Sequence, residues 1–174
     1  MLQSDREGPA IEVNNSLREP LPPAQKNMQL LRDLFLAMDI PGPESEKAIT
    51  NMLDENISWV EVPWNRTLSG REEVLATVKH TWVTGIPSHP ITHVFADEEW
   101  VCVEYVLAGK KKEGNMLFND GDVVARGQLN VQACSLFHVK NGKVDIAHEY
   151  IDTLTMFRQL GVNPPAAAPS SNPA

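Results

Sequence analysis

Residues 137–152 read FHVKNGKVDIAHEYID, and this stretch decides how the C-terminal half of the chain folds. An Asn-Gly pair between two alternating runs is typical of a two-residue β-hairpin, so we predict a turn at residues 141–142. Alternation in the second strand places Glu149 on the same face as Asp145, Ala147 and Ile151. The stretch therefore predicts a strand in which the carboxylate of Glu149 lies between apolar neighbours.

The rest of the chain changes from helical to strand-like patterning as it is followed from the N-terminus. Apolar residues recur at spacings of three and four up to Trp82, and β-branched alternation follows. Helices first and a meandering sheet afterwards indicate an α+β fold with the helices packed on one face of the sheet. We expect helices over residues 24–39, in a shorter segment ending at Met52 and Leu53, from the capping-box sequence SGRE (69–72) to Trp82, and over 153–160 before Gly161. We expect strands over residues 57–62, 90–96, 100–107, 123–139 and 144–151. The polar segment 109–122 is predicted to be a long hairpin loop.

Composition limits the class of protein. The chain has 174 residues, 42% of them hydrophobic, and a formal net charge of −8. That balance argues against sequence-independent binding of nucleic acid or of an anionic membrane. No apolar run approaches the ~20 residues of a membrane span, and the N-terminus lacks signal-peptide features, so we expect a cytoplasmic protein.

The chain is predicted to have an irregular arm (1–23), one domain (24–162) and a Pro/Ala/Ser-rich tail (163–174). We expect Cys102 and Cys134 to be buried thiols rather than a disulfide.

Three glutamates lie in unusually apolar stretches. Glu61 lies between tryptophans and valines, Glu104 in the run VCVEYVL (101–107), and Glu149 in the last strand. Desolvation raises the pKa of a carboxyl group and fits it for general acid/base work near neutral pH. The alternative is that each glutamate points to solvent from a half-buried strand.

The motifs of several other chemistries do not occur in the sequence. We find no phosphate-binding glycine loop, no zinc-ligand spacing and no Gly-x-Ser-x-Gly motif. His138 and His148 fall on the two strands of the last hairpin, and we interpret them as polar positions on a sheet face rather than metal ligands. We therefore expect chemistry without a metal or a cofactor.

Two further stretches, LSGREEV (68–74) and FRQLG (157–161), carry a family resemblance together with the last hairpin. With the strand that ends at Pro63, they resemble the SnoaL-like polyketide cyclases and limonene-epoxide hydrolases of the nuclear transport factor 2-like superfamily. The resemblance covers about residues 26–162. It implies a cone-shaped, curved mixed β-sheet with N-terminal helices that close an apolar pocket, in a chain that pairs as a homodimer.

The resemblance also implies roles for particular positions. Glu149 stands where these enzymes have a catalytic Asp, so the carboxylate is kept. Trp59 and Glu61 stand where the epoxide hydrolases have a Tyr and an Asn that hold the attacking water. Tyr105 and Leu107 stand where those hydrolases have an Arg and a proton-donating Asp. Leucine has no proton to donate, so the hydrolase mechanism does not carry over as it stands.

The expected function follows from the residues that remain. Ser135 stands where cyclases have a His, which leaves Glu149 as general base, Tyr105 as hydrogen-bond donor and Glu61 as second acid. We expect acid/base isomerisation, cyclisation or epoxide opening on a small, mostly apolar molecule, with a limonene-epoxide-hydrolase-like hydrolase or a non-catalytic binding or dimerisation module as alternatives. The residues expected to contact the substrate are Trp59, Trp64, Leu107, Val131, Ala133 and Ser135.

Overall fold

The computed structural model describes residues 21–85, 88–118 and 121–161, and these form four α-helices and one curved sheet. A short 3₁₀ helix, η1, separates the first two strands. The elements are α1 (Pro23–Asp39), α2 (Pro43–Met52), β1 (Leu53–Glu61), η1 (Val62–Trp64), β2 (Arg66–Ser69), α3 (Arg71–Thr84), β3 (Ile91–Ala96), β4 (Trp100–Phe118), β5 (Gly121–Lys140), β6 (Lys143–Ile151) and α4 (Thr153–Leu160). The predicted α+β class is confirmed.

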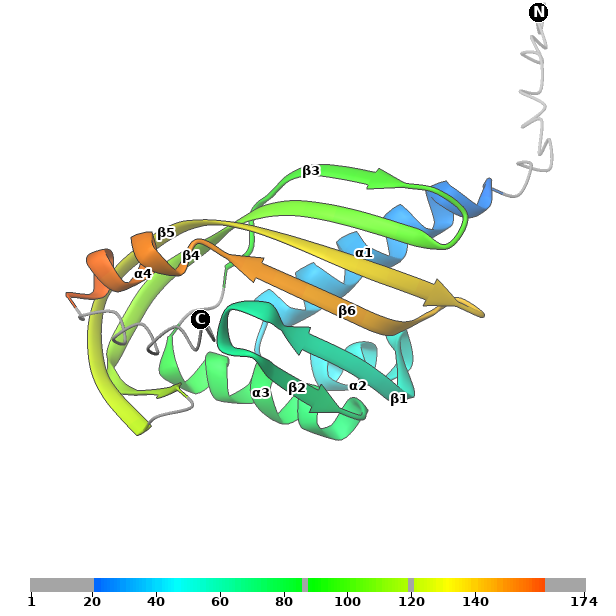
Figure 1. The fold of residues 1–174 in the computed structure, drawn as a ribbon. Coiled ribbons are helices and arrows are strands. Elements are labelled where there is room, and N and C mark those ends of the chain that lie inside the picture. The colour runs from blue at the N-terminus through cyan, green and yellow to red at the C-terminus, as the bar shows by residue number, and fades with distance from the viewer. Residues whose placement is uncertain (1–20, 86–87, 119–120, 162–174) are drawn as a thin grey trace, which may run out of the picture.

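The sheet has six strands in the order β2-β1-β6-β5-β4-β3. Every neighbouring pair is antiparallel except β1 and β6, which run parallel. Figure 1 shows the long β4–β5 hairpin curving round one end of the molecule, with α1, α2 and α3 on the concave side of the sheet. This arrangement is the helix-covered, curved sheet that the resemblance implies.

An aromatic cluster fills the space between α1 and the sheet. Phe137 of β5 is fully buried, and its ring meets those of Phe35 and Trp59 edge to face, with centroid distances of 5.9 and 5.6 Å. Edge-to-face aromatic pairs add to the free energy gained by burial alone. The cluster therefore ties α1, β1 and β5 together beside the site described below.

The last hairpin forms as predicted. Lys140 pairs with Lys143, and Asn141 and Gly142 between them have φ angles of 52° and 73°, as the two-residue turn requires. The helix after the hairpin also has its predicted bounds and ends at Gly161, which has a φ of 68°.

Residues 109–118 and 121–122, predicted as part of a loop, are instead strand residues. β4 and β5 continue as an antiparallel pair from Gly109, opposite Leu129, to Phe118, opposite Gly121, with a register shift between Lys111 and Gly114. The prediction was wrong because polar composition was taken as a loop signal, whereas a ladder is held by backbone hydrogen bonds that any non-proline residue can make.

Smaller differences concern element boundaries. Leu53 starts β1 rather than ending α2, and the short strand β2 was not predicted. The capping interaction of α3 is also different from the one expected at residues 69–72: the carboxylate of Glu73, not Glu72, accepts a hydrogen bond of 2.8 Å from the backbone of Ser69. Helix α1 starts at Pro23, at the edge of the expected arm; the rest of that arm up to residue 20 and the tail 163–174 lie outside the described residues.

The outer face of the sheet carries the residues with the opposite alternation. Cys102 and Cys134 are free thiols there, 3.5 Å apart between sulfur atoms, and both are half-buried rather than buried. The desolvation of Cys134 and its hydrogen bond with Cys102 raise the pKa of Cys134 to about 11. His138 lies opposite Ile146 and His148 opposite Leu136, so the two histidines are diagonal neighbours rather than direct partners.

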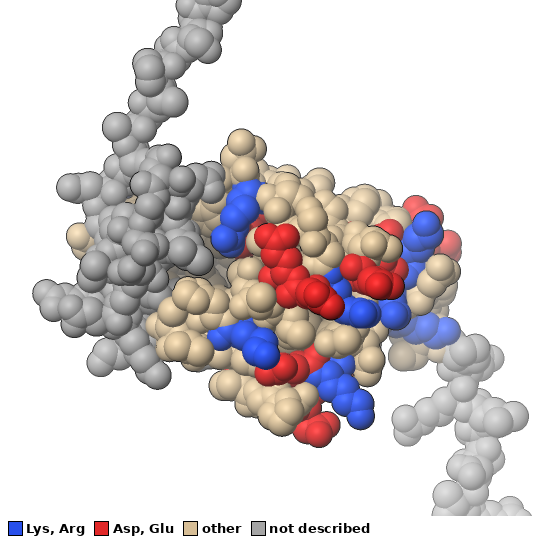
Figure 2. All heavy atoms as spheres, turned by 90° about the horizontal axis from the view of Figure 1, so that it is seen from below, with Lys and Arg blue, Asp and Glu red and all other residues tan. Residues whose placement is uncertain are grey.

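The charges on the helical side are mixed in sign. Figure 2 shows acidic and basic side chains interspersed over the described part of this face. One ion pair, 3.0 Å between Lys79 Nζ and Glu46 Oε2, joins α3 to α2. None of the described helices is long and apolar enough to cross a membrane.

We expect Phe137→Ala to lower the free energy of unfolding by about 3–5 kcal/mol, because it removes the ring at the centre of the aromatic cluster. Urea denaturation measures this loss. Phe95→Ala on the outer face, where the side chain is 60% exposed, is the matched control and should change stability by less than about 0.5 kcal/mol. Equal losses in the two variants would contradict the assignment of the core.

Candidate active site

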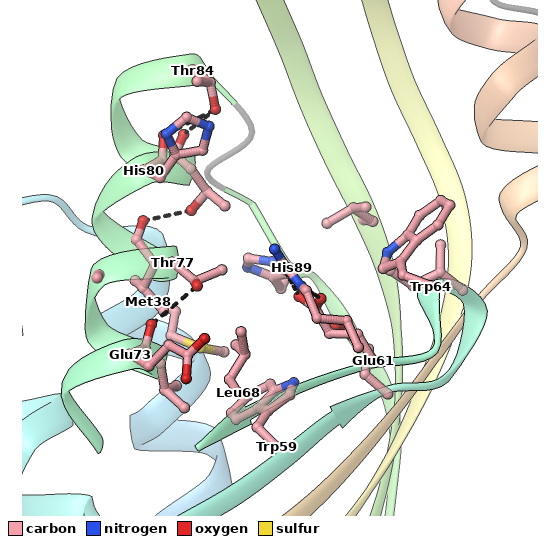
Figure 3. A pocket seen from close by; sticks show the side chains of 18 of the residues that line it. Met38, Trp59, Glu61, Trp64, Leu68, Glu73, Thr77, His80, Thr84 and His89 are labelled. Carbon is pink, nitrogen blue, oxygen red and sulfur yellow. Dashed lines mark hydrogen bonds and ion pairs between the residues drawn. The ribbon is translucent and has the colours of Figure 1, made fainter. Parts of the chain in front are cut away.

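A cavity of about 400 Å³ lies between α3, the end of α1 and the concave face of the sheet. Its volume is in the range of small-molecule sites. Figure 3 shows side chains from α3 on one wall and from β1 and η1 on the other. Six of the nine predicted site residues line this cavity: Trp59, Glu61, Trp64, Tyr105, Leu107 and Glu149.

The other three predicted residues lie beneath the cavity wall. Ser135 is fully buried and hydrogen bonds with the hydroxyl of Tyr105 at 3.2 Å. Val131 is buried in a second apolar cluster with Leu107, and Ala133 is nearly buried in the main core. Ser135 therefore lies behind Tyr105, and Val131 and Ala133 pack in the apolar core.

Glu149 and Tyr105 are joined by a direct hydrogen bond. The Tyr105 hydroxyl donates to Glu149 Oε1 at 2.7 Å, and both side chains face the cavity from the concave side of the sheet. Tyr105 is almost fully buried, and this burial together with the neighbouring carboxylate raises the pKa of its hydroxyl well above the ordinary tyrosine value. The tyrosine therefore keeps its proton and acts as a donor.

The pKa of Glu149 is raised above the ordinary glutamate value. Desolvation is the largest cause, and the negative charge of Glu61 adds to it. The hydrogen bonds from Tyr105 and Trp59 and the charge of His89 act in the opposite direction. Glu149 is thus a carboxyl whose proton affinity is increased by burial and whose position is fixed by donors.

Glu61 lines the same cavity, but its hydrogen-bond partner is an arginine rather than a tyrosine. It is the register partner of Glu149 on the parallel pair β1–β6, which explains why both carboxyls face the cavity. Arg66 of β2 donates two hydrogen bonds to Glu61. Its Nε donates to Oε2, and its Nη2 donates to Oε1 at 2.8 Å. In this fork geometry both carboxylate oxygens of Glu61 accept hydrogen bonds.

Glu104 is the glutamate that faces away from the site. Its side chain is half exposed on the outer face of the sheet, where Oε2 lies 3.0 Å from His93 Nδ1. Glu104 therefore points to solvent from a half-buried strand, which was the alternative interpretation of the three glutamates, whereas Glu61 and Glu149 face the cavity.

Sequence reasoning missed a histidine in the cavity wall. His89 lines the cavity, and Asp39 at the end of α1 holds it through two contacts: the backbone N–H of His89 donates to Oδ2 at 3.0 Å, and Nδ1 lies 2.5 Å from Oδ1. A carboxylate at the C-terminus of a helix opposes the helix dipole. An aspartate in that position was a usable sign that a hydrogen-bond donor lies nearby.

The α3 wall was missed as well. Thr77, Thr81 and Thr84 follow one another along the helix and line the cavity, and each hydroxyl donates its proton to a carbonyl of the helix itself. Each hydroxyl oxygen can still accept a further hydrogen bond. The prediction recorded only the apolar stripe of this helix, which packs Val74 and Val78 into the core.

The described residues contain no group of three His, Cys, Asp or Glu side chains that could hold a metal ion. What they do assemble is an acid/base set: one carboxyl with a raised pKa, one phenol donor, one paired carboxylate and one imidazole held by an aspartate. Mostly apolar side chains such as Phe35 and Leu68 surround this set.

This fold and cavity define a class of protein, the cone-shaped α+β proteins with a pocket on the concave face of the sheet. The chain belongs to the SnoaL-like polyketide cyclase family, whose sequence profile matches residues 43–160. No curated protein matches the chain.

Solved structures share the fold at low sequence identity. The SnoaL-like polyketide cyclase described from Jannaschia sp. CCS1 is 17% identical with a TM-score of 0.68, over 84% of this chain and 99% of that one. A protein with a ketosteroid isomerase-like fold from Catenulispora acidiphila is 15% identical with a TM-score of 0.62, over 78% and 94%. An epoxide hydrolase of the limonene-epoxide-hydrolase-like (LEH-like) type from M. tuberculosis is 16% identical with a TM-score of 0.60, over 80% and 92%. These similarities show the fold alone.

We expect Arg66→Gln to lower the free energy of unfolding by about 1–3 kcal/mol, because it leaves the nearly buried Glu61 carboxylate without its guanidinium partner. Adding Glu61→Gln to this variant should recover part of the loss. Urea denaturation of the two single variants and the double variant measures the coupling. Strictly additive losses would mean that the pair contributes nothing.

A second prediction concerns the pH dependence of stability. Because the folded-state pKa of Glu149 is raised, its contribution to stability is complete below the ordinary glutamate pKa and is lost as the pH rises through the raised value. Glu149→Gln cannot ionise and still accepts the hydrogen bond from Tyr105. We expect its melting temperature to exceed that of the wild type at about pH 8 and the difference to vanish near about pH 4. Calorimetry at both pH values measures this, and a difference that does not depend on pH would contradict it.

Proposed function

We propose that this protein is a cofactor-independent enzyme that transfers a proton at carbon in a small, mostly apolar molecule, as an isomerase or cyclase, with Glu149 as general base. One observation carries the proposal: the Glu149 carboxyl lies in a cavity of about 400 Å³, accepts a hydrogen bond from Tyr105 and has a raised pKa. A carboxylate with increased proton affinity is a better base than an exposed one.

The proposed reaction begins when ionised Glu149 takes a proton from a carbon next to a carbonyl group. The electron pair of the broken C–H bond moves toward the carbonyl oxygen. In an isomerisation the same carboxyl returns the proton to another carbon. In a cyclisation the carbon nucleophile attacks a second carbonyl of the substrate, the π electrons of that carbonyl move onto its oxygen, and this oxygen takes the proton from Glu149. Tyr105 orients the base, and Trp59 and Trp64 form part of the apolar wall of the cavity.

Epoxide opening is the alternative chemistry for the same base, with Glu149 taking a proton from an attacking water. It ranks second because Leu107 lines the cavity at the position where the resemblance places the proton-donating Asp of the hydrolases. A non-catalytic binding module is the alternative from another class. Such a module would bind its ligand equally well with glutamine at position 149.

The test is a panel of cyclic ketones and β-keto esters in deuterated water, followed by NMR for exchange and rearrangement. Cyclic epoxides in ¹⁸O-labelled water are assayed in parallel. We expect wild-type protein to exchange or rearrange at least one carbon acid and Glu149→Gln to be slower by about 100-fold or more. Glu104→Gln is the matched control, because this half-exposed glutamate faces away from the cavity and should leave the rate unchanged.

The other outcomes separate the alternatives. Labelled diol from an epoxide, lost in Glu149→Gln, would identify a hydrolase. Ligand binding without turnover, equal in wild type and variant, would identify a binding module. Undiminished carbon exchange in Glu149→Gln would exclude Glu149 as the base.

A further inference from the structure

His89 lines the cavity and is held by the carboxylate of Asp39, although no part of the proposed reaction above uses it. Asp39 accepts hydrogen bonds from both the backbone N–H and the ring Nδ1 of His89. An imidazole whose Nδ1–H is held by a carboxylate keeps a defined tautomer and orientation. The second ring nitrogen, Nε2, is then the atom that exchanges protons with a ligand.

The ring is also oriented by packing. It meets the rings of Phe35 and Tyr105 at centroid distances of 5.9 and 5.7 Å, and its side chain is 14% exposed. Figure 3 shows His89 between the α3 wall and the strand that carries Glu61. Within residues 21–85, 88–118 and 121–161, no hydrogen-bond partner is found for Nε2.

The imidazole is electrostatically linked to the proposed base. Tyr105 contacts the His89 ring and donates its hydroxyl to Glu149, and a positive charge on His89 lowers the pKa of Glu149. An ionised Glu149 and a protonated His89 therefore favour each other. The other titratable or charged groups that line the cavity are Glu61, Arg66, Glu73 and His80.

We propose that His89 is a second catalytic residue, which donates its Nε2 proton to the carbonyl oxygen of the substrate, and that Asp39 is its positioning residue. The proposal rests on the proposed function and adds to it the group that donates a proton to the carbonyl oxygen of the substrate. Its oxygen would lie at His89 and its acidic carbon at Glu149.

The proton balance of the step is complete within the cavity. Glu149 takes the carbon proton, the C–H electron pair forms the carbon–carbon double bond of an enol, and the π electrons of the carbonyl move onto oxygen. That oxygen takes the Nε2 proton, which leaves His89 neutral. In the return step His89 recovers the proton from oxygen, and Glu149 delivers its proton to carbon.

Phenols of graded acidity test the oxygen site without turnover, because a phenolate resembles an enolate in shape and charge. We expect wild-type protein to bind them, with affinity rising with phenol acidity, measured by tryptophan fluorescence. In His89→Gln the affinity should fall about 10- to 100-fold. The ¹⁵N signals of His89 should show a proton on Nδ1 and move at Nε2 when a phenol binds.

His138→Gln is the matched control, because His138 Nδ1 lies 2.6 Å from Asp145 Oδ1 in a similar dyad outside the cavity. It should leave phenol affinity unchanged. Asp39→Asn should weaken binding less than His89→Gln and change the protonation of Nδ1 in the NMR spectrum. A purely structural role for Asp39 would change the melting temperature without changing that signal.

The outcomes separate this proposal from the proposed function. Carbon-acid exchange by wild type that falls about 100-fold or more in His89→Gln supports both. Exchange that is unchanged in a folded His89→Gln, or a wild type that binds no phenol, overturns the role of His89 and leaves Glu149 in place. Phenol binding that depends on His89 without any carbon-acid exchange overturns the proposed function and also the catalytic role of His89.

Discussion

The parallel pairing of β1 with β6 is the constraint on which the site depends, because it makes Glu61 and Glu149 register partners above the same cavity. Two carboxylates in one apolar space repel each other and both lose hydration. The structure relieves this in two different ways. Arg66 binds Glu61 as a fork, and Tyr105 gives Glu149 a single hydrogen bond. One carboxylate is thus charge-paired while the other remains a group whose pKa is raised.

This difference gives two like residues different chemistry. Desolvation dominates the environment of Glu149, so burial increases its proton affinity, while donors from β1 and β4 hold it in place. The helices complete the site. Helix α3 supplies threonine oxygens along one wall, and the end of α1 supplies Asp39, which holds His89. Solved structures described as a SnoaL-like polyketide cyclase and as an epoxide hydrolase share this fold, and a fold alone does not define a reaction.

Much of the sheet side of the site could be predicted by alternation. The period of two places Trp59 and Glu61 on one face of β1, and Ala147 and Glu149 on one face of β6. The Asn-Gly turn predicts the hairpin but not the register at Glu149, because the pairing of β5 with β6 shifts by one residue between His138 and Val139. Alternation could not separate Glu104 from the other two glutamates, because it says which residues share a face but not which face is covered by helices. It also gave no information on how far β4 and β5 extend.

The α+β class, the last hairpin and the candidate carboxylates could be predicted from the sequence, because they depend on local periods and turn residues; the family resemblance depends on particular stretches of sequence. The partners of the site residues follow only from tertiary packing: Arg66 for Glu61, Tyr105 for Glu149, and Asp39 for His89. The last pair is separated by 50 residues. Such contacts arise from how helices pack on a curved sheet, and no local pattern encodes the distance between two side chains on different elements.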